Sequence, residues 1–126
     1  MRVCTAGAIL LLTWFPAPAS SQTVSDAGNK IATLALHAMF DDDQSAIAKC
    51  QEARNVAVGF GRDPILDGLV ERCFAMIDSK FRRQRSACDH YRRALQHLES
   101  APKGHRLSEA LDNALYQTRN QLKEAC

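Results

Sequence analysis

The sequence has few residues that break or bend a chain, and neither sign of charge is in large excess. Its 126 residues include only six glycines, four prolines and 6% aromatic residues, and the formal net charge is +2. The low glycine and proline content excludes collagen-like and proline-rich disordered chains, and the balanced charge gives no reason to expect a nucleic-acid partner. This length, with 46% hydrophobic residues, predicts one globular domain.

Motifs that carry catalysis are missing too. The chain has no G-x-S-x-G, no H-E-x-x-H, no phosphate-binding loop and no dinucleotide-binding glycine pattern. A C-x-x-C pair, which many zinc sites and thioredoxin-like sites use, is also lacking. His90 and His97 would lie about 10 Å apart along a helix, too far to share a metal, and we expect both on the solvated surface. We predict no catalytic residue, no metal and no cofactor.

The N-terminus has the pattern of a secretory signal peptide. Arg2 precedes an uncharged apolar stretch at residues 3–15, and small residues at the −3 and −1 positions allow cleavage after Ala19. The stretch is shorter than the roughly 20 residues that cross a bilayer, and no other segment is apolar enough to do so. We expect residues 1–19 to be removed and residues 20–126 to form one secreted domain. Because no Asn-x-Ser/Thr sequon occurs, the periplasm is favoured over the extracellular space.

Four cysteines remain in the predicted mature chain: Cys50, Cys73, Cys88 and Cys126. An even number in an exported protein predicts two disulfides. Antiparallel helices rise equally on both sides of their turn, so bridged cysteines should lie equally far from it. The midpoint of Cys50 and Cys73 falls within residues 59–64, which favours pairing these two and, in turn, Cys88 with Cys126. The alternative, Cys73–Cys88 with Cys50–Cys126, stays open because its own midpoint lies near a weaker turn at Ser79.

Helical periodicity runs through the rest of the chain, and strand alternation is nowhere sustained. The first helix is expected to begin near Thr23, because Thr23 and Asp26 have the spacing of a capping box. The aspartates at 41–43 could suggest calcium, but the glycine and distal glutamate of an EF-hand loop are missing. We interpret them as the cap and first turn of a second helix, where acidic residues are favourable.

Two breaks divide the later part of the chain. At residues 59–64, Gly61 suits a left-handed cap, Asp63 an N-cap and Pro64 the first position of a helix. Around residues 79–85 the apolar pattern lapses into a basic run, which we interpret as a turn. The predicted fold class is all-α, a small antiparallel bundle of four to five helices stapled by two disulfides.

One stretch resembles part of a known repeat. Four residues have the spacing found in the second helix of a tetratricopeptide repeat: Ala87, Tyr91, Ala94 and Leu95. The positions of the first helix, which hold Trp, Leu, Gly and Tyr in the repeat, are occupied here by Glu71, Phe74, Ala75 and Asp78. The resemblance therefore covers half of one repeat, without the period of an array. It implies repeat-like helical hairpins.

Charge is distributed unevenly along the chain. Residues 80–106 hold eight lysines and arginines against two acidic residues, whereas the rest of the predicted mature chain holds seven against twelve. Four arginines of this segment share one flank beside the apolar stripe: Arg82, Arg85, Arg92 and Arg93. Asp89 lies within that flank, so part of the charge is paired locally. The flank either packs against the acidic part of the domain or forms a docking face for an anionic partner.

These features predict a non-enzymatic protein-interaction module that binds through the basic flank. Its partner would be another envelope or secreted protein, or an anionic surface such as lipid headgroups or an envelope polymer. The alternative is a carrier that holds a small apolar ligand between helices, lined by Leu34, Ile47, Leu69, Phe74, Ile77 and Leu111. A cavity inside the bundle would favour the carrier, and an exposed arginine flank over a dense core would favour docking.

Overall fold

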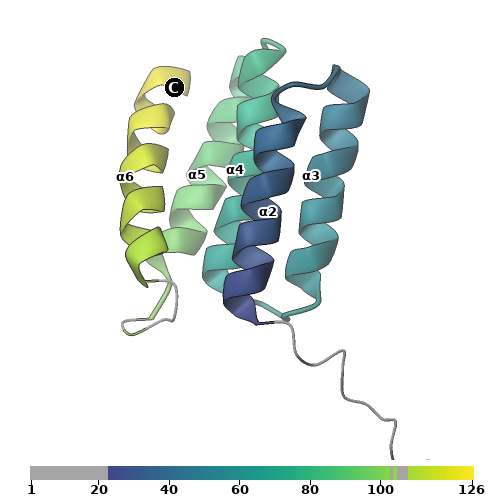
Figure 1. Ribbon diagram of the computed structural model, residues 1–126. Coiled ribbons are helices and arrows are strands. Elements are labelled where there is room, and N and C mark those ends of the chain that lie inside the picture. Colours follow the sequence, from purple (N-terminus) through teal and green to yellow (C-terminus); the bar gives the residue numbers. More distant parts are fainter. Residues whose placement is uncertain (1–22, 103, 105–107) are drawn as a thin grey trace, which may run out of the picture.

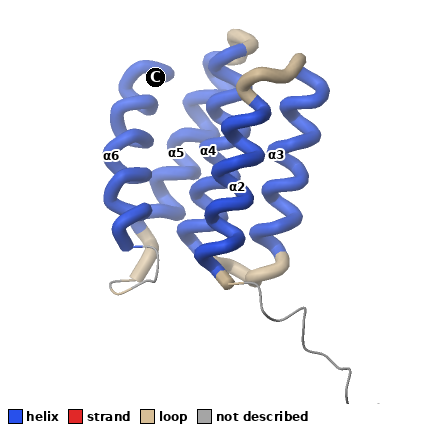
Figure 2. The backbone as a smooth tube through the Cα atoms, in the orientation of Figure 1, coloured by secondary structure: helices blue, strands red, loops and turns tan. Residues whose placement is uncertain are grey.

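Five helices joined by short turns make up the described chain. The computed structural model describes residues 23–102, 104 and 108–126, and this part contains no strand. The helices are α2 (Val24–Ala38), α3 (Asp43–Val58), α4 (Pro64–Lys80), α5 (Gln84–Glu99) and α6 (Ser108–Ala125). Each runs antiparallel to the helix before it (Figure 1 and Figure 2). The prediction of a small antiparallel all-α bundle is confirmed.

Acidic side chains start the first two helices, as the sequence predicted. The Thr23 hydroxyl accepts a hydrogen bond from the backbone N–H of Asp26 at 3.0 Å, and the Asp26 carboxylate accepts one from the N–H of Thr23 at 3.3 Å. This capping box opens α2. Asp42 caps α3, because its carboxylate accepts from the N–H of Ser45 at 2.9 Å. The capping interpretation of the aspartate run is therefore confirmed.

Both predicted breaks are turns. In the first, Gly61 has a φ of 74°, and the Asp63 carboxylate accepts from the backbone N–H groups of Ile65 and Leu66 at 3.0 Å each. Pro64 takes the first helical position of α4, where no N–H is needed. In the second turn, Arg82 adopts a φ of 64°, a left-handed conformation that is uncommon for a residue other than glycine. That residue turns the chain back into α5.

Helix α4 lies at the centre of the bundle. Among the described residues it packs against all four other helices, whereas the α2–α3 hairpin makes no backbone contact with the α5–α6 hairpin. Helix α4 approaches α5 closely at Gly68, where a Cβ would lie 2.7 Å from Leu98 Cδ2 and 3.2 Å from the carbonyl oxygen of Ala94. A glycine at this position lets the two backbones come together. Three residues of the repeat-like half-motif are buried in α5: Ala87, Tyr91 and Ala94.

Two disulfides link neighbouring helices. Cys50 of α3 is bonded to Cys73 of α4, with their Cα atoms 5.6 Å apart, and Cys88 of α5 is bonded to Cys126, with a Cα–Cα distance of 5.3 Å. The favoured pairing is thus the one present, and the alternative through Cys73–Cys88 is wrong. The turn at residues 59–64 makes α3 and α4 antiparallel, and Cys50 and Cys73 therefore face each other between the two helices.

The interior consists of several small apolar clusters. One holds Leu66 and Val70 against α2 and α3, and another holds Ile65 and Leu98 against α6. The six residues proposed to line a carrier cavity are divided among three of these clusters: Leu34, Ile47, Leu69, Phe74, Ile77 and Leu111. Of the six, Leu69 alone lines a groove described below. The other five serve to pack the helices together.

Candidate docking surface

The four arginines predicted to form one basic flank have different environments. Arg82 lies in the α4–α5 turn and Arg85 in the first turn of α5; both are exposed and form no ion pair within the described part of the chain. Arg92 is exposed and lies 3.4 Å from the Asp89 carboxylate. Arg93 donates from Nε to Glu71 of α4 at 3.2 Å. Arg82 and Arg85 can therefore bind a partner without breaking an ion pair to another described residue.

A shallow, open depression on α5 brings some of these residues together. Arg85 and Arg93 both line it, and the other lining residues are Arg83, Gln84, Ser86 and Asp89. Arg82 and Arg92 are not among the lining residues. The depression is basic because three guanidinium groups surround one carboxylate. The predicted flank is thus a surface around the start of α5 rather than one continuous stripe.

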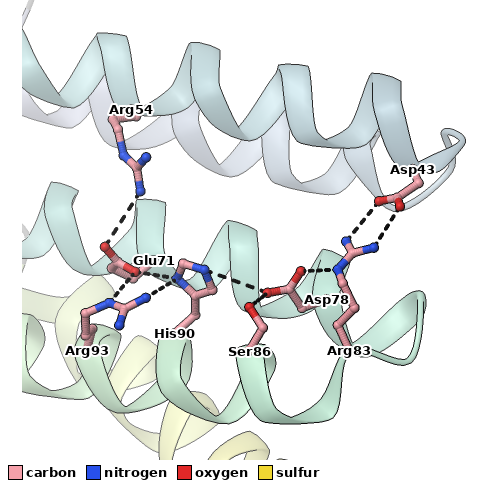
Figure 3. A network of polar contacts seen from close by, with 8 residues as sticks. All are labelled: Asp43, Arg54, Glu71, Asp78, Arg83, Ser86, His90 and Arg93. Atoms are coloured by element: carbon pink, nitrogen blue, oxygen red, sulfur yellow. Dashed lines mark hydrogen bonds and ion pairs between the residues drawn. The ribbon is translucent and has the colours of Figure 1, made fainter.

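Arg83, which the sequence analysis did not select, connects three helices. Its Nη1 and Nη2 donate to the two carboxylate oxygens of Asp43 at 2.7 and 2.9 Å, and its Nε donates to Asp78 at 2.7 Å (Figure 3). Hydrogen bonds to Asp43 and then Asp78 raise the pKa of Arg83, and the bond from Arg83 lowers the pKa of Asp43. Arg83 is a structural cation, since both its acceptors belong to the protein.

His90 is not the solvated surface residue that we expected. Its side chain is only 17% exposed, with Nδ1 2.6 Å from Glu71 and Nε2 3.7 Å from Asp78. The ring also stacks on Phe74, with centroids 5.5 Å apart. The wheel of α5 alone placed His90 outside the apolar stripe. Helix α4 covers that flank with two carboxylates and an aromatic ring, and this cover is a tertiary property.

Eight residues form a polar network between α3, α4 and α5 (Figure 3): Asp43, Arg54, Glu71, Asp78, Arg83, Ser86, His90 and Arg93. Within this polar network, Glu71 is an acceptor shared by several side chains. Its side chain is 14% exposed and lies near Arg54 of α3, His90 and Arg93. Burial opposes ionisation of Glu71, but hydrogen bonding and charge attraction from His90 and Arg93 outweigh it, so the pKa of Glu71 is lowered. Arg54 also lies over the Phe74 ring, 4.5 Å from its centroid. Every charged member of the network has an opposite charge beside it.

The polar contacts of the network join side chains of different helices. Its carboxylates accept from arginines and lie beside His90, and Ser86 donates to Asp78. Within the described ranges, no group of three or more His, Cys, Asp and Glu side chains could hold a metal ion. The network therefore acts to connect α3, α4 and α5.

The opposite side of α4 carries a groove with a different lining. By helical periodicity, Glu71 and Asp78 share one side of α4, and Leu69, Arg72 and Met76 share another. The groove follows α2 over this second side in two adjoining parts. One part, of about 290 Å³, lies between α2 and α6, and the other, of about 200 Å³, lies between α2 and α4. The sequence analysis did not select Arg72, because a single arginine near an apolar stripe has no distinguishing pattern.

The disulfides bear on where the protein resides. Such bridges form and persist in oxidising compartments outside the cytosol. In the part of the chain that the structure describes, no helix is both long and apolar enough to cross a membrane. The predicted signal peptide at residues 1–19 lies outside the described residues.

The fold and the charged surface together define a small, disulfide-linked, all-α protein with an exposed basic patch. Comparison with known proteins adds no closer assignment. No family model matches this chain, and no curated protein or solved structure matches it.

Proposed function

We propose that this protein is an exported, non-enzymatic interaction module that docks an anionic partner on the basic surface around the start of α5. The observation that carries the proposal is the exposure of Arg82 and Arg85 without an ion pair among the described residues. Nearby cations such as Arg83 are engaged by carboxylates of the protein itself. Arg82 and Arg85 keep their full charge for a partner.

Several features of this surface suit docking rather than catalysis. Arg83 fixes the backbone next to Arg82, because its side chain is held by α3 and α4 at the same time. The exposed cations therefore lie on a rigid support. Exposed charges of this kind mainly raise the association rate and orient the partner, and their effect weakens with salt.

The proposed partner is an acidic protein of the envelope or a secreted acidic protein, or an anionic envelope surface. The proposal includes export through the N-terminal signal peptide and residence in the periplasm. Mass spectrometry of exported protein should then give an N-terminus at Ser20 or within two residues of it. A chain in the membrane fraction that retains Met1 would contradict export by cleavage.

A charge-reversal experiment tests the docking surface. The double change Arg82→Glu and Arg85→Glu should leave the melting temperature nearly unchanged, because neither side chain has an ion pair in the described chain. It should strongly reduce capture of acidic components from an envelope fraction by immobilised protein at low salt. The matched control is Lys30→Glu with Lys123→Glu, which makes the same charge change on exposed positions of α2 and α6.

Three outcomes decide the matter. Loss of capture in the arginine variant alone supports docking at α5. Equal loss in both variants would mean that only net charge matters, and equal capture by all three proteins would remove the proposal. The six proposed carrier residues are divided among three packed clusters, and five of them line neither part of the groove, so the internal carrier has no comparable observation in its favour.

A further inference from the structure

We propose that the groove along α2 is a binding site for a small apolar carboxylic acid. The carboxylate would lie on Arg72, and the apolar chain would lie along Leu36 and Met76. This site is on the other side of α4 from the polar network. It does not depend on the proposed docking surface.

Arg72 differs from the arginines that contact the polar network on the other side of α4. Its Nε donates to the side-chain oxygen of Gln121 at 3.2 Å, and its Nη2 donates to that of Gln117 at 2.9 Å. Both acceptors are neutral amides, and within the described residues no carboxylate lies at ion-pair distance from Arg72. Arg54 and Arg93, by contrast, both lie against Glu71. The positive charge of Arg72 is oriented but not neutralised.

The local environment makes this charge costly. Burial lowers the pKa of Arg72, since the guanidinium loses part of its hydration without gaining an anion. A guanidinium has five N–H donors, and the two glutamines occupy one on Nε and one on Nη2. The remaining donors, on Nη1 and Nη2, form a fork that matches the two oxygens of a carboxylate. Binding such a group would replace the lost hydration.

The groove has an apolar end and an amide-lined end, and Arg72 lies where they join. Three residues line both parts: Ala32, Leu69 and Arg72. Toward one end the lining is apolar and includes Leu36, whose side chain is left 59% exposed, and Met76. An apolar chain there would cover surface that is now in contact with water. A mostly apolar cleft with a few placed polar groups is the usual form of a small-molecule site.

The charge pattern favours a single carboxylate over an acidic protein segment. An acidic segment would bring several negative charges, but Arg72 is the one cation among the residues that line the two described parts of the groove. The small side chains of Ala32 and Ala35, which line the apolar part, leave room for a chain of the width of an alkyl group. The ligand that matches both features has one acid group and one apolar tail.

The test is a calorimetric titration with octanoate and with octanol, which has the same chain length and no charge. The native protein should bind octanoate, and octanol more weakly. The change Arg72→Met should weaken octanoate by about tenfold or more, the scale of a charge-assisted hydrogen-bonded pair, and leave octanol unchanged. The change Ala32→Phe fills the groove from an exposed position and should abolish binding of both. The control Arg92→Met removes an exposed cation of α5 and should bind both as the native protein does.

Other results would overturn the inference. These are failure of octanoate to bind the native protein, and binding of octanoate to Arg72→Met or Ala32→Phe as strong as to the native protein. A hexaglutamate peptide that binds through Arg72 when octanoate does not would assign the groove to acidic protein segments instead. If Arg72→Met fails to fold, Leu36→Asp at an exposed position should still weaken octanoate. The variant Arg82→Glu with Arg85→Glu should bind octanoate normally, which separates this site from the docking surface.

Discussion

The charged side chains on the two sides of α4 have opposite environments. Toward α3 and α5, Glu71 and Asp78 are surrounded by arginines and by His90, so the charges neutralise one another within the protein. Toward α2 and α6, Arg72 donates to two amide oxygens and has no carboxylate at ion-pair distance among the described residues. Charges that neutralise one another connect the helices of the fold, whereas a charge in a groove without an opposite charge beside it is available to a ligand.

The walls of the two sides are also attached differently. Helix α3, which borders the polar network, is bonded to α4 through Cys50 and Cys73, both essentially inaccessible to solvent. Helix α6, which borders the groove, is bonded to α5 through Cys88 and the exposed Cys126. The groove wall thus depends on a bridge that solvent can reach. The Cys50–Cys73 bridge is essentially inaccessible to solvent, although Cys73 also lines the apolar end of the groove.

Removing a disulfide should have the largest effect on stability. Replacing Cys50 and Cys73 together by Ala should lower the free energy of unfolding by about 2–4 kcal/mol, mainly because the unfolded chain gains freedom. Helical circular dichroism below the melting point should stay nearly the same. Urea denaturation measures the loss, and non-reducing peptide mapping checks that the native pairs are Cys50–Cys73 and Cys88–Cys126.

Mild reduction of the native protein tests whether the two disulfides differ in their accessibility to solvent. The Cys88–Cys126 bridge should be reduced first, because thiol attack requires access to a sulfur atom. Octanoate binding should then fall while the α3–α4 bridge is intact. Faster reduction of Cys50–Cys73 would contradict the assignment of accessible and inaccessible walls.

The change Glu71→Gln should have the next largest effect. The amide cannot accept from His90, Arg93 and Arg54 as a carboxylate does, so a loss of about 1–3 kcal/mol is expected near neutral pH. Because folding lowers the pKa of Glu71, its stabilisation is present above the ordinary value of 4.5 and is lost as pH falls through the lower folded-state pKa. Melting temperatures of both proteins should therefore converge in acid. A gap that stays constant with pH would contradict this.

Replacing one arginine on each side of α4 compares how much the two sides contribute to stability. Arg93→Met should destabilise the protein by about 0.5–1 kcal/mol, since Arg93 pairs with the partly buried Glu71 from a half-exposed position. Arg72→Met should change stability by less than about 0.5 kcal/mol, because water can hydrate the two released glutamines. Equal losses by chemical denaturation would mean that Arg72 stabilises the fold as the polar network does.

The one expected gain in stability concerns the inner face of the groove wall. Thr118 of α6 is fully buried, and its hydroxyl has no hydrogen-bond partner among the described residues. Thr118→Val keeps the shape and removes an unsatisfied polar group, so stability should rise by up to about 1 kcal/mol. Thr118→Ser keeps the hydroxyl and serves as the control. A loss of stability in the valine variant would show that the hydroxyl is satisfied in solution.

Local features of the fold could be predicted from the sequence because their causes are local. The capping box at Thr23 and Asp26, and Asp63 before Pro64, involve residues within three positions of one another. The pairing of Cys50 with Cys73 also followed from local geometry, since two helices joined by a short turn must be antiparallel. The break at the basic run was visible as a lapse in the apolar stripe.

The site was harder to predict because its properties arise between helices. The wheel of α5 placed Arg85, Arg92 and Arg93 on one flank, but it could not show that Arg93 meets Glu71 and that Arg85 meets no acid in the described chain. The same limit explains His90. Its own helix gives it an exposed position, and Phe74 and Glu71 of α4 cover it.

The sequence alone predicted the capped helix starts at Thr23 and Asp63 and favoured the pairing of Cys50 with Cys73, because each depends on one helix or on two helices joined by a short turn. Tertiary structure decided which charges are matched. Arg72 and Arg93 are both arginines on adjoining helices, yet Arg93 donates to a carboxylate and Arg72 donates to two amides. The physical reason is that the energy of a charge depends on the groups within a few ångströms of it, and in a bundle those groups come from other helices.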